Sequence, residues 1–144
     1  MLQCTFFNKY TQNELNIMEF STPIISTAEK IFPEKILRPW GWYENLYEGE
    51  GYKVKRLFVN TRQSISLQKH FKRSEQWVVV KGDGIIQLGD FIQPAKLYDV
   101  FHIKVGEVHR LTGGDSGILI MEIQFGNECI EEDIERLEDN YGRV

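Results

Sequence analysis

The sequence lacks the features that mark membrane and secreted proteins. No apolar run approaches the length needed to cross a bilayer, and the first residues, MLQCTFFNKYTQNE, have neither the basic end nor the apolar centre of a signal peptide. The two cysteines, Cys4 and Cys129, stand at opposite ends of the chain and outside any paired metal-ligand spacing. We therefore expect free thiols, no membrane association and a cytoplasmic location.

A strong charge of either sign is also missing. The 144 residues include 17 Lys and Arg against 21 Asp and Glu, which gives a formal net charge of -4, and the basic residues are scattered. This argues against nucleic acid as a partner, although a small anion can still bind locally. The length and an apolar fraction of 42% suit one domain with one core.

The pattern of apolar residues divides the chain near residue 38. Residues 1–37 show little periodicity apart from a short helix predicted in STAEKIF, and we assign them to an arm that packs on the rest. From Tyr52 on, short segments rich in β-branched and aromatic residues alternate with turn residues: YKVKRLFVN, SISLQKH, EQWVVVKG, GIIQLG, YDVFHI and GILIMEIQ. This spacing predicts an all-β sandwich or barrel over residues 38–144.

Turn residues and the end of the chain complete this prediction. Gly82-Asp83-Gly84 and Gly113-Gly114-Asp115 can supply the positive φ angles that tight connections need. The segment EEDIERLEDNYG predicts a short C-terminal helix with Ile134 and Leu137 on one face.

The segment SISLQKH has an unusual alternation. On a strand, Ser64, Ser66, Gln68 and His70 share one face and Ile65 and Leu67 share the other. The polar face either lines a site inside a barrel or meets water at the surface. If it lines a site, Ile65 and Leu67 point away from it, and we predict that a homodimer covers them.

Spacing brings further metal-ligating side chains toward this strand. Gln68 and His70 point the same way, Glu75 follows after a turn, and His109 follows a glycine in KVGEVHRL. A mixed set of nitrogen and oxygen ligands suits zinc, manganese, iron or nickel better than magnesium. His102 lies outside this set, and we interpret it as structural.

Two segments resemble the cupin pattern, which is His-x-His, a glutamate, a glycine and later Pro-x-Gly-x-x-His. They are QKHFKRSEQWVVVKG and KVGEVH, in which Gln68 replaces the first histidine and Lys104 replaces the proline. The stretch from Ser66 to Val79 also resembles a signature of the type II phosphomannose isomerases, Ser-Leu-Gln-x-His-x-x-Arg-x-Glu-x-Trp-x-Val-Val. Gln76 stands where that family usually has histidine. Three further segments match the same family: RPWGWYENL, YKVKRL and EDIERLEDNYGR.

The resemblance implies a single cupin barrel, a double-stranded β-helix or jelly roll, that interconverts mannose 6-phosphate and fructose 6-phosphate. It implies one divalent metal ion, zinc before manganese, cobalt, iron or nickel, held by Gln68, His70, Glu75 and His109. Many members are fused to a nucleotidyltransferase that makes GDP-mannose. No Gly-rich nucleotide loop occurs near the start of this chain, so we expect the isomerase module alone.

The resemblance also implies residues for the sugar phosphate. Arginines at matching positions suggest a phosphate cluster: Arg38, Arg73, Arg136 and Arg143. For the chemistry we propose Arg38, Lys55 and Glu75, with Gln124 beside the substrate. Alternatively, Arg136 and Arg143 pair with neighbouring acidic residues, and Glu122 and Gln124 face solvent instead of the barrel.

Two other functions remain open at this stage. Because of the departures at Gln76 and Lys104, a sugar-phosphate-binding or structural cupin without catalysis is one alternative. An isomerase or epimerase of another phosphorylated sugar would share the same site. In the enzymatic readings the partner is a small phosphorylated sugar.

Overall fold

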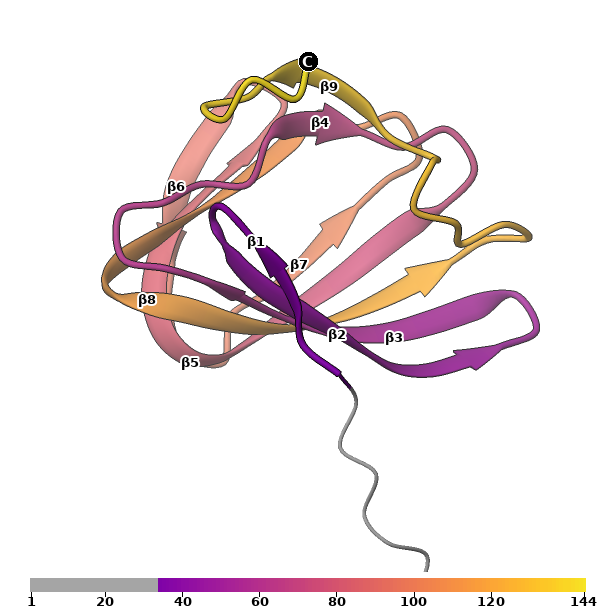
Figure 1. Cartoon of the computed structure of the whole chain (residues 1–144), viewed down its shortest axis with the longest axis horizontal. Coiled ribbons are helices and arrows are strands. Elements are labelled where there is room, and N and C mark those ends of the chain that lie inside the picture. The colour runs from indigo at the N-terminus through magenta and orange to yellow at the C-terminus, as the bar shows by residue number, and fades with distance from the viewer. Residues whose placement is uncertain (1–33) are drawn as a thin grey trace, which may run out of the picture. The chain divides into compact units, whose positions relative to one another are not determined.

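The structure, a computed structural model, describes residues 34–144. These residues form nine strands and no helix, so none of them belongs to a helix that could span a membrane. The strands are β1 (Ile36–Arg38), β2 (Gly41–Gly49), β3 (Tyr52–Val59), β4 (Leu67–Lys69), β5 (Ser74–Leu88), β6 (Phe91–Ala95), β7 (Val100–Ile103), β8 (His109–Phe125) and β9 (Glu135–Glu138). The all-β barrel expected from the sequence is confirmed (Figure 1).

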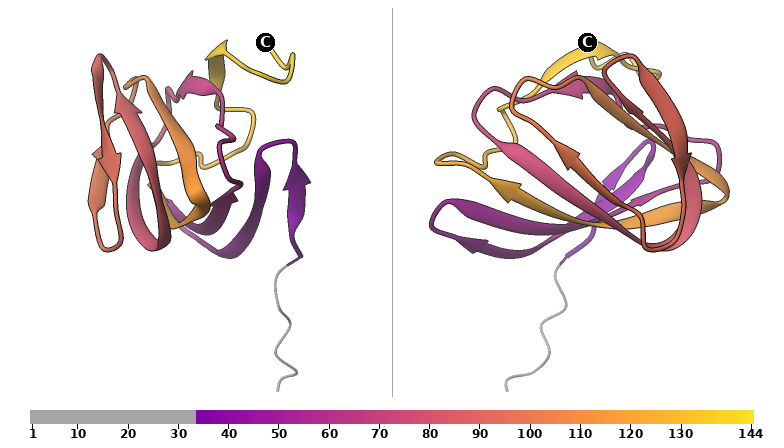
Figure 2. Two further views of the ribbon diagram at one scale, coloured as in Figure 1. Left: turned by 90° about the vertical axis from the view of Figure 1, so that its left-hand side faces the viewer. Right: turned by 180° about the vertical axis from the view of Figure 1, so that it is seen from behind.

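The strands form one sheet that curls around an interior. Its main path runs β1-β2-β3-β8-β4-β9, and β5 pairs with β8 and with both β6 and β7. Strand β8 therefore has β3 and β4 on one side and β5 on the other (Figure 2). Because β5 and β8 are 15 and 17 residues long, each contributes to both ends of the barrel.

The two long strands bend where their pairing is irregular. The register between β5 and β8 shifts at Val79/Lys81 and again at Gly82/Gly84. Gly82 has a φ of 75°, and a Cβ at this position would lie 2.0 Å from the carbonyl oxygen of Gly117. Only glycine fits such a contact at positive φ. The predicted turn at Gly82 is therefore a bulged bend inside a strand.

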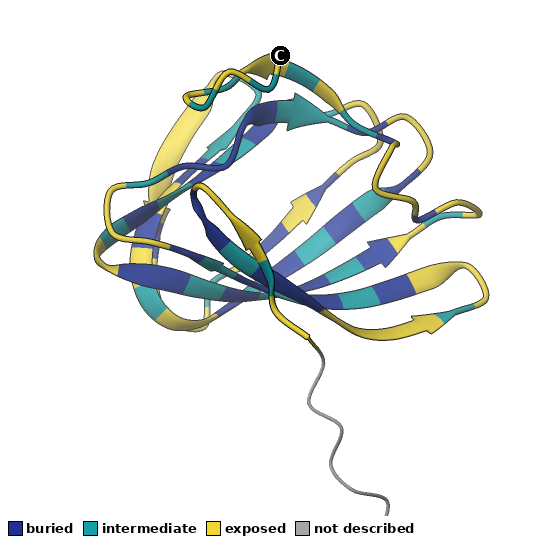
Figure 3. Ribbon diagram, in the orientation of Figure 1, coloured by how far each residue is buried: buried dark blue, intermediate teal, exposed yellow. Residues whose placement is uncertain are grey.

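The interior of the barrel is apolar at one end and polar at the other. Inward positions alternate along the strands, as the bands of buried residues in Figure 3 show. On β3 the buried side chains change from Lys53 and Lys55 to apolar residues, and on β8 they change from apolar residues to Glu122 and Gln124. Cross-strand register places Lys53 and Glu75 on either side of Gln124, so the polar positions of three strands meet.

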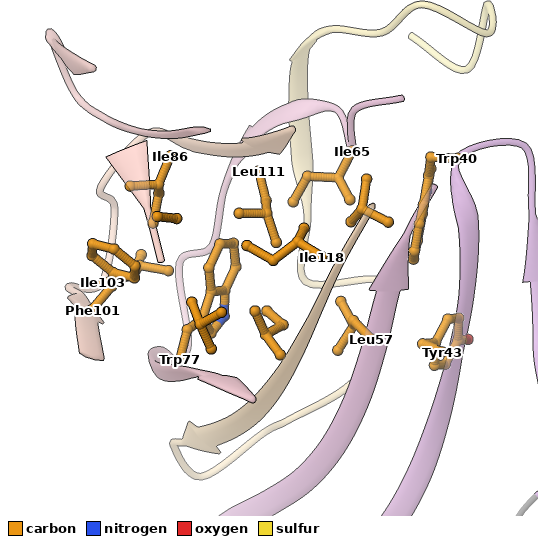
Figure 4. Close-up of a cluster of buried hydrophobic side chains, with 14 residues drawn as sticks. Trp40, Tyr43, Leu57, Ile65, Trp77, Ile86, Phe101, Ile103, Leu111 and Ile118 are labelled. Carbon is orange, nitrogen blue, oxygen red and sulfur yellow. The ribbon is translucent and has the colours of Figure 1, made fainter. Parts of the chain in front are cut away.

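The apolar end is a continuous core. It is shown in Figure 4 and includes two large aromatic side chains, Trp40 and Trp77. Buried aliphatic residues fill the space between the strands: Leu57, Val59, Ile65, Val79, Ile86, Ile103, Leu111, Ile118 and Ile120. This core fixes the strands whose other ends carry the polar residues.

The predicted C-terminal helix is wrong. Residues 135–138 form strand β9, which pairs with β4, and Leu137 is exposed instead of sharing a buried face with Ile134. Backbone pairing at the edge of β4 outweighs a helix propensity that is weak in a segment this short. Asp139 also holds the following turn, because its carboxylate accepts the backbone N–H groups of Tyr141 and Arg143.

Ile65 and Leu67 do not face outward as the sequence suggested. Both are buried within the chain, and Ile65 belongs to the core. The exposed apolar side chains of β6 and the turn after it, Phe91, Ile92 and Tyr98, offer a different surface for the homodimer, which stays a prediction.

The boundary proposed for the arm falls close to the start of the described residues. Strand β1 begins at Ile36, so two residues assigned to the arm belong to the sheet. The rest of the arm, with its predicted helix in STAEKIF, lies outside the described residues.

Candidate functional site

Three metal-ligating side chains meet at the polar end of the barrel. His70 follows β4, Glu75 lies on β5 and His109 begins β8, and one ligand atom from each lies within 4.8 Å of the others. His70 Nε2 is 3.2 Å from Glu75 Oε1, and His109 Nε2 is 3.7 Å from Glu75 Oε2. All three are buried, whereas His102 is exposed on β7.

Backbone carbonyl groups orient both imidazole rings. His70 Nδ1 donates to the carbonyl oxygen of Asp133 at 2.5 Å, and His109 Nδ1 donates to that of Glu107 at 2.9 Å. Each ring therefore presents the lone pair of Nε2 to the site, as a metal-bound histidine does when its other ring nitrogen donates to a carbonyl group. Burial lowers the pKa of His70 to about 4, which keeps the ring neutral and able to bind a cation at neutral pH.

This donor set fits a divalent ion such as zinc. His70 Nε2 and Glu75 Oε1 are both electron-pair donors, and two such atoms 3.2 Å apart call for a cation near them. Gln68 fits less well, because its Oε1 accepts from Ser66 and its amide nitrogen faces His109 Nε2 at 3.5 Å. Gln68 must turn its amide over before its oxygen can bind a metal.

Arg73 supplies the positive charge beside the triad in this structure. Its Nε donates to Glu75 Oε1 at 2.9 Å, and its Nη2 donates to His70 Nε2 at 3.2 Å. Its Nη1 donates to the carbonyl oxygens of Ile130 and Asp133. With a side chain only 5% exposed and most donors used, Arg73 holds the site together and has few hydrogen bonds left for a phosphate.

Sequence reasoning missed Asp133. Its carboxylate accepts the backbone N–H groups of Phe71 at 2.9 Å and Lys72 at 3.1 Å, and its carbonyl oxygen accepts from His70 and Arg73. Asp133 therefore ties the C-terminal segment to the turn that carries two site residues. It is 63 positions from His70 in an acidic stretch, and no local pattern distinguishes it from its neighbours.

A pocket of about 130 Å³ opens beside the triad. It brings together the proposed residues Arg38, Lys55, Gln68, Arg73, Glu75, Gln124, Arg136 and Arg143, while His70 and His109 lie against Glu75. Four more polar side chains that were not proposed also line it: Tyr43, Ser66, Glu122 and Glu131. The sequence left the direction of Glu122 and Gln124 open, and both point inward.

The arginines of the pocket differ in their partners. Arg143 forms a two-contact pair with Asp139, at 2.5 and 3.0 Å, as the alternative interpretation of its segment expected. Arg38 donates to the hydroxyl of Tyr43 and to the carbonyl oxygen of Leu37. Arg136 has no hydrogen-bond or ion-pair partner among residues 34–144, and its Nε is buried. Arg136 is thus the arginine with the most donors free for an anion.

Lys55 and Glu122 are buried on adjacent strands at the base of the pocket. Lys55 Nζ is 2.8 Å from Glu131 Oε1 and lies 4.1 Å from the centre of the Tyr43 ring. Burial acts to lower the pKa of Lys55, but the charges of Glu122 and Glu131 outweigh it and raise the pKa. Burial and repulsion from Glu75 raise the pKa of Glu122 to about 7, although Lys55 acts against them.

The raised pKa of Glu122 predicts a pH-dependent effect of Glu122→Gln on stability. Because the pKa is about 7 in the folded chain and 4.5 in the reference state, the wild type loses stability from this group as pH rises from 4.5 to 7. The variant has no such loss. Its free energy of unfolding should rise relative to the wild type by on the order of 2–3 kcal/mol across this window.

Urea denaturation of both proteins at several pH values, with a chelator present, measures this difference. Subtracting the free energy of unfolding of one protein from that of the other, at each pH, removes the contributions of groups that titrate alike in both. A difference that stays constant from pH 4.5 to 8 would show that Glu122 ionises normally in the folded chain.

Comparison with known proteins identifies a family model and several relatives that match most of this chain. The family model described as mannose-6-phosphate isomerase C-terminal matches residues 26–139. The xanthan biosynthesis protein XanB of Xanthomonas campestris pv. campestris (strain B100) is 36% identical over 118 residues, which are 81% of this chain and 25% of XanB. The alginate biosynthesis protein AlgA of Pseudomonas aeruginosa is 37% identical over 76% of this chain and 23% of AlgA. The chain thus spans about a quarter of these curated relatives.

Solved structures with low sequence identity share the fold. Oxalate decarboxylase from Bacillus subtilis aligns with a TM-score of 0.67 at 15% identity, over 73% of this chain and 30% of the decarboxylase. The capsular polysaccharide assembling protein CapF from Staphylococcus aureus aligns with a TM-score of 0.64 at 18% identity, over 75% and 32% of the two chains. A protein from Klebsiella pneumoniae described as having a double-stranded β-helix domain aligns with a TM-score of 0.62 at 16% identity, over 72% of this chain and 90% of that protein. This likeness confirms the cupin barrel.

Proposed function

Since this chain belongs to the mannose-6-phosphate isomerase C-terminal family, we propose that it is a metal-dependent isomerase that interconverts mannose 6-phosphate and fructose 6-phosphate. The observation that carries the proposal is one pocket lined by a buried lysine, several arginines and Glu75, which joins the pocket to the His-Glu-His cluster. An aldose–ketose isomerisation needs these elements, because it requires an electrophile at the sugar oxygens, a base near carbon and an anchor for phosphate.

Each group has a separate role in this proposal. A divalent ion, with zinc as our choice, would be held by His70, Glu75 and His109 and would polarise the sugar oxygens when bound. Arg136 and Arg38 bind the phosphate, since Arg136 has free donors and an arginine fork matches phosphate geometry. Lys55 is protonated at neutral pH and neutralises negative charge that develops on the sugar oxygens.

The test of this function is turnover on purified, metal-loaded protein. A coupled assay should detect fructose 6-phosphate formed from mannose 6-phosphate and no reaction with unphosphorylated mannose. Zinc, manganese, cobalt and nickel are each added back to metal-free protein. If folded, metal-loaded protein does not convert mannose 6-phosphate with any of these metals, the isomerase function is excluded. A sugar-phosphate-binding cupin without catalysis would then be the remaining function.

The role of Arg136 gives a sharper expectation. Arg136→Ala should lower kcat/KM for mannose 6-phosphate by about ten- to a hundredfold, because it removes charge-assisted hydrogen bonds worth about 1.5–3 kcal/mol. Metal content should not change, because Arg136 does not contact the triad.

Arg110→Ala is the matched control for Arg136. Arg110 also has a buried Nε without a partner among the described residues, but it pairs with Glu138 and does not line the pocket. The control should keep its kcat/KM within about threefold of the wild type. Equal losses in the two variants would remove Arg136 from the phosphate site.

A further inference from the structure

The proposed isomerisation needs a group that takes a proton from one carbon and returns it to the next. Glu75 is poorly suited to this task, because both of its carboxylate oxygens are engaged. Its Oε1 accepts from Arg73 and lies 3.2 Å from His70 Nε2, and its Oε2 accepts from Trp77 Nε1 at 3.1 Å. A carboxylate that also belongs to a metal site has little basicity left for a carbon acid.

Two other ionisable groups of the pocket are also engaged. Lys55 is a cation whose Nζ contacts Glu131 at 2.8 Å, so it has no free electron pair at neutral pH. Glu131 is the partner in that ion pair, and its side chain is 45% exposed. Its pKa is lowered on balance: burial acts to raise it, but the charge of Lys55 and its hydrogen bond outweigh burial. Such a carboxylate is a weak base in contact with water.

Glu122 differs from all of these groups. It is 2% exposed, lines the pocket, and lies on β8 with Lys55 opposite on β3 and Trp77 opposite on β5. Its Oε1 accepts one hydrogen bond, from Gln124 Nε2 at 2.6 Å, while its Oε2 accepts none from residues 34–144. One oxygen is thus fixed by a neighbour and the other is free, as an oriented proton carrier requires.

We propose that Glu122 carries the proton between C1 and C2 of the bound sugar phosphate, an inference that rests on the proposed isomerase function. Its place on β8 fits this role, because the same stretch of the barrel wall carries Gln124 toward Glu75 and faces Lys55. The carbon acid would therefore lie between a base and two sources of positive charge, the metal site and Lys55. A carboxyl group whose pKa is about 7 is also well matched to accept and return a proton at neutral pH.

The proton inventory balances without any further reactant. The Glu122 carboxylate takes the proton from C2 of the open-chain aldose, the C–H electron pair forms the C1=C2 bond, and the carbonyl pair moves to O1. Lys55 protonates O1 and then recovers a proton from the hydroxyl at O2. As the C2 carbonyl forms, the double-bond pair takes the proton from Glu122 onto C1. One proton has moved from C2 to C1 and one from O2 to O1.

The experiment compares Glu122→Gln with the wild type, both metal-loaded and both shown to be folded by thermal unfolding. The substrate is mannose 6-phosphate deuterated at C2, and the two readouts are fructose 6-phosphate formation and loss of deuterium from C2. Glu122→Gln should lower both rates at least a hundredfold, in the range seen when a general base is removed. Its metal content and its affinity for mannose 6-phosphate should stay within about threefold of the wild type.

Two further variants separate chemistry from packing. Glu44→Gln removes another buried glutamate, which pairs with Arg56 and lies outside the pocket, and it should keep both rates. Glu122→Asp returns a carboxylate that is one methylene shorter, and it should regain part of the activity that glutamine loses.

Each outcome decides between the two proposals. If the wild type converts mannose 6-phosphate and Glu122→Gln is equally active, this inference is overturned and the isomerase function stands. Loss of metal from Glu122→Gln would make Glu122 a support of the metal site and would also overturn the inference. Wild type that shows neither turnover nor loss of deuterium would overturn the isomerase function and the inference with it.

Discussion

Replacing His70 or His109 with alanine should empty the metal site, while the wild type carries about one divalent ion per chain. Each imidazole supplies one of the three ligand atoms that converge within 4.8 Å among residues 34–144, and its loss leaves a set that holds no metal tightly. Elemental analysis of purified protein measures the occupancy. Added zinc should raise the wild-type unfolding free energy by about 2.7 kcal/mol at a hundredfold excess over Kd, and should not stabilise the variants.

His102→Ala is the control for these two variants. His102 is exposed on β7 and lies outside the triad, so its removal should change neither the metal content nor the stabilisation by zinc. Full occupancy in both His70→Ala and His109→Ala would disprove the metal site.

Arg73→Ala should destabilise the metal-free protein by about 3–5 kcal/mol. The Arg73 guanidinium is buried between Glu75 and Asp133, and its removal leaves buried carboxylate charge without a partner. The family resemblance implied instead a phosphate anchor whose loss affects catalysis alone. Chemical denaturation in the presence of a chelator measures the change in stability.

Two comparisons test the origin of this effect. Arg62→Ala removes an arginine from an exposed pair with Asp115 and should change stability by less than about 1 kcal/mol. Adding Glu75→Gln to Arg73→Ala removes the unpaired charge and should recover part of the lost stability. An Arg73→Ala protein as stable as the wild type but poor in turnover would return Arg73 to the role of phosphate anchor.

The sequence predicted that His70, Glu75 and His109 lie close together, because their positions follow strand geometry. Alternation on a strand and a short turn bring His70 and Glu75 together, and β8 begins at His109 after the turn at Gly106. The inward direction of Glu122 and Gln124 could not be predicted in the same way. Alternation fixes which residues share a face of β8, but only the pairing of β8 with β3 and β5 decides which face is inside.

The C-terminal segment shows where sequence reasoning fails. The spacing of Ile134 and Leu137 fits a helix, but the segment is extended and its contacts are with residues far away in the sequence. Asp133 reaches the turn after β4, and β9 pairs with β4 itself. Such contacts depend on the finished barrel, so no local pattern in the segment encodes them.

The scattered origin of the site also determines how metal affects folding. Lys55 contacts a residue 76 positions away, His70 one that is 63 away, and Gln68 one that is 41 away. Domains built from such distant pairings fold slowly, since loop closure must precede the contacts that reward it. The triad and the carbonyl groups that orient it extend from His70 to Asp133, so no short fragment contains all of them. Metal can therefore stabilise only the closed barrel, and it should slow unfolding while leaving the folding rate nearly unchanged.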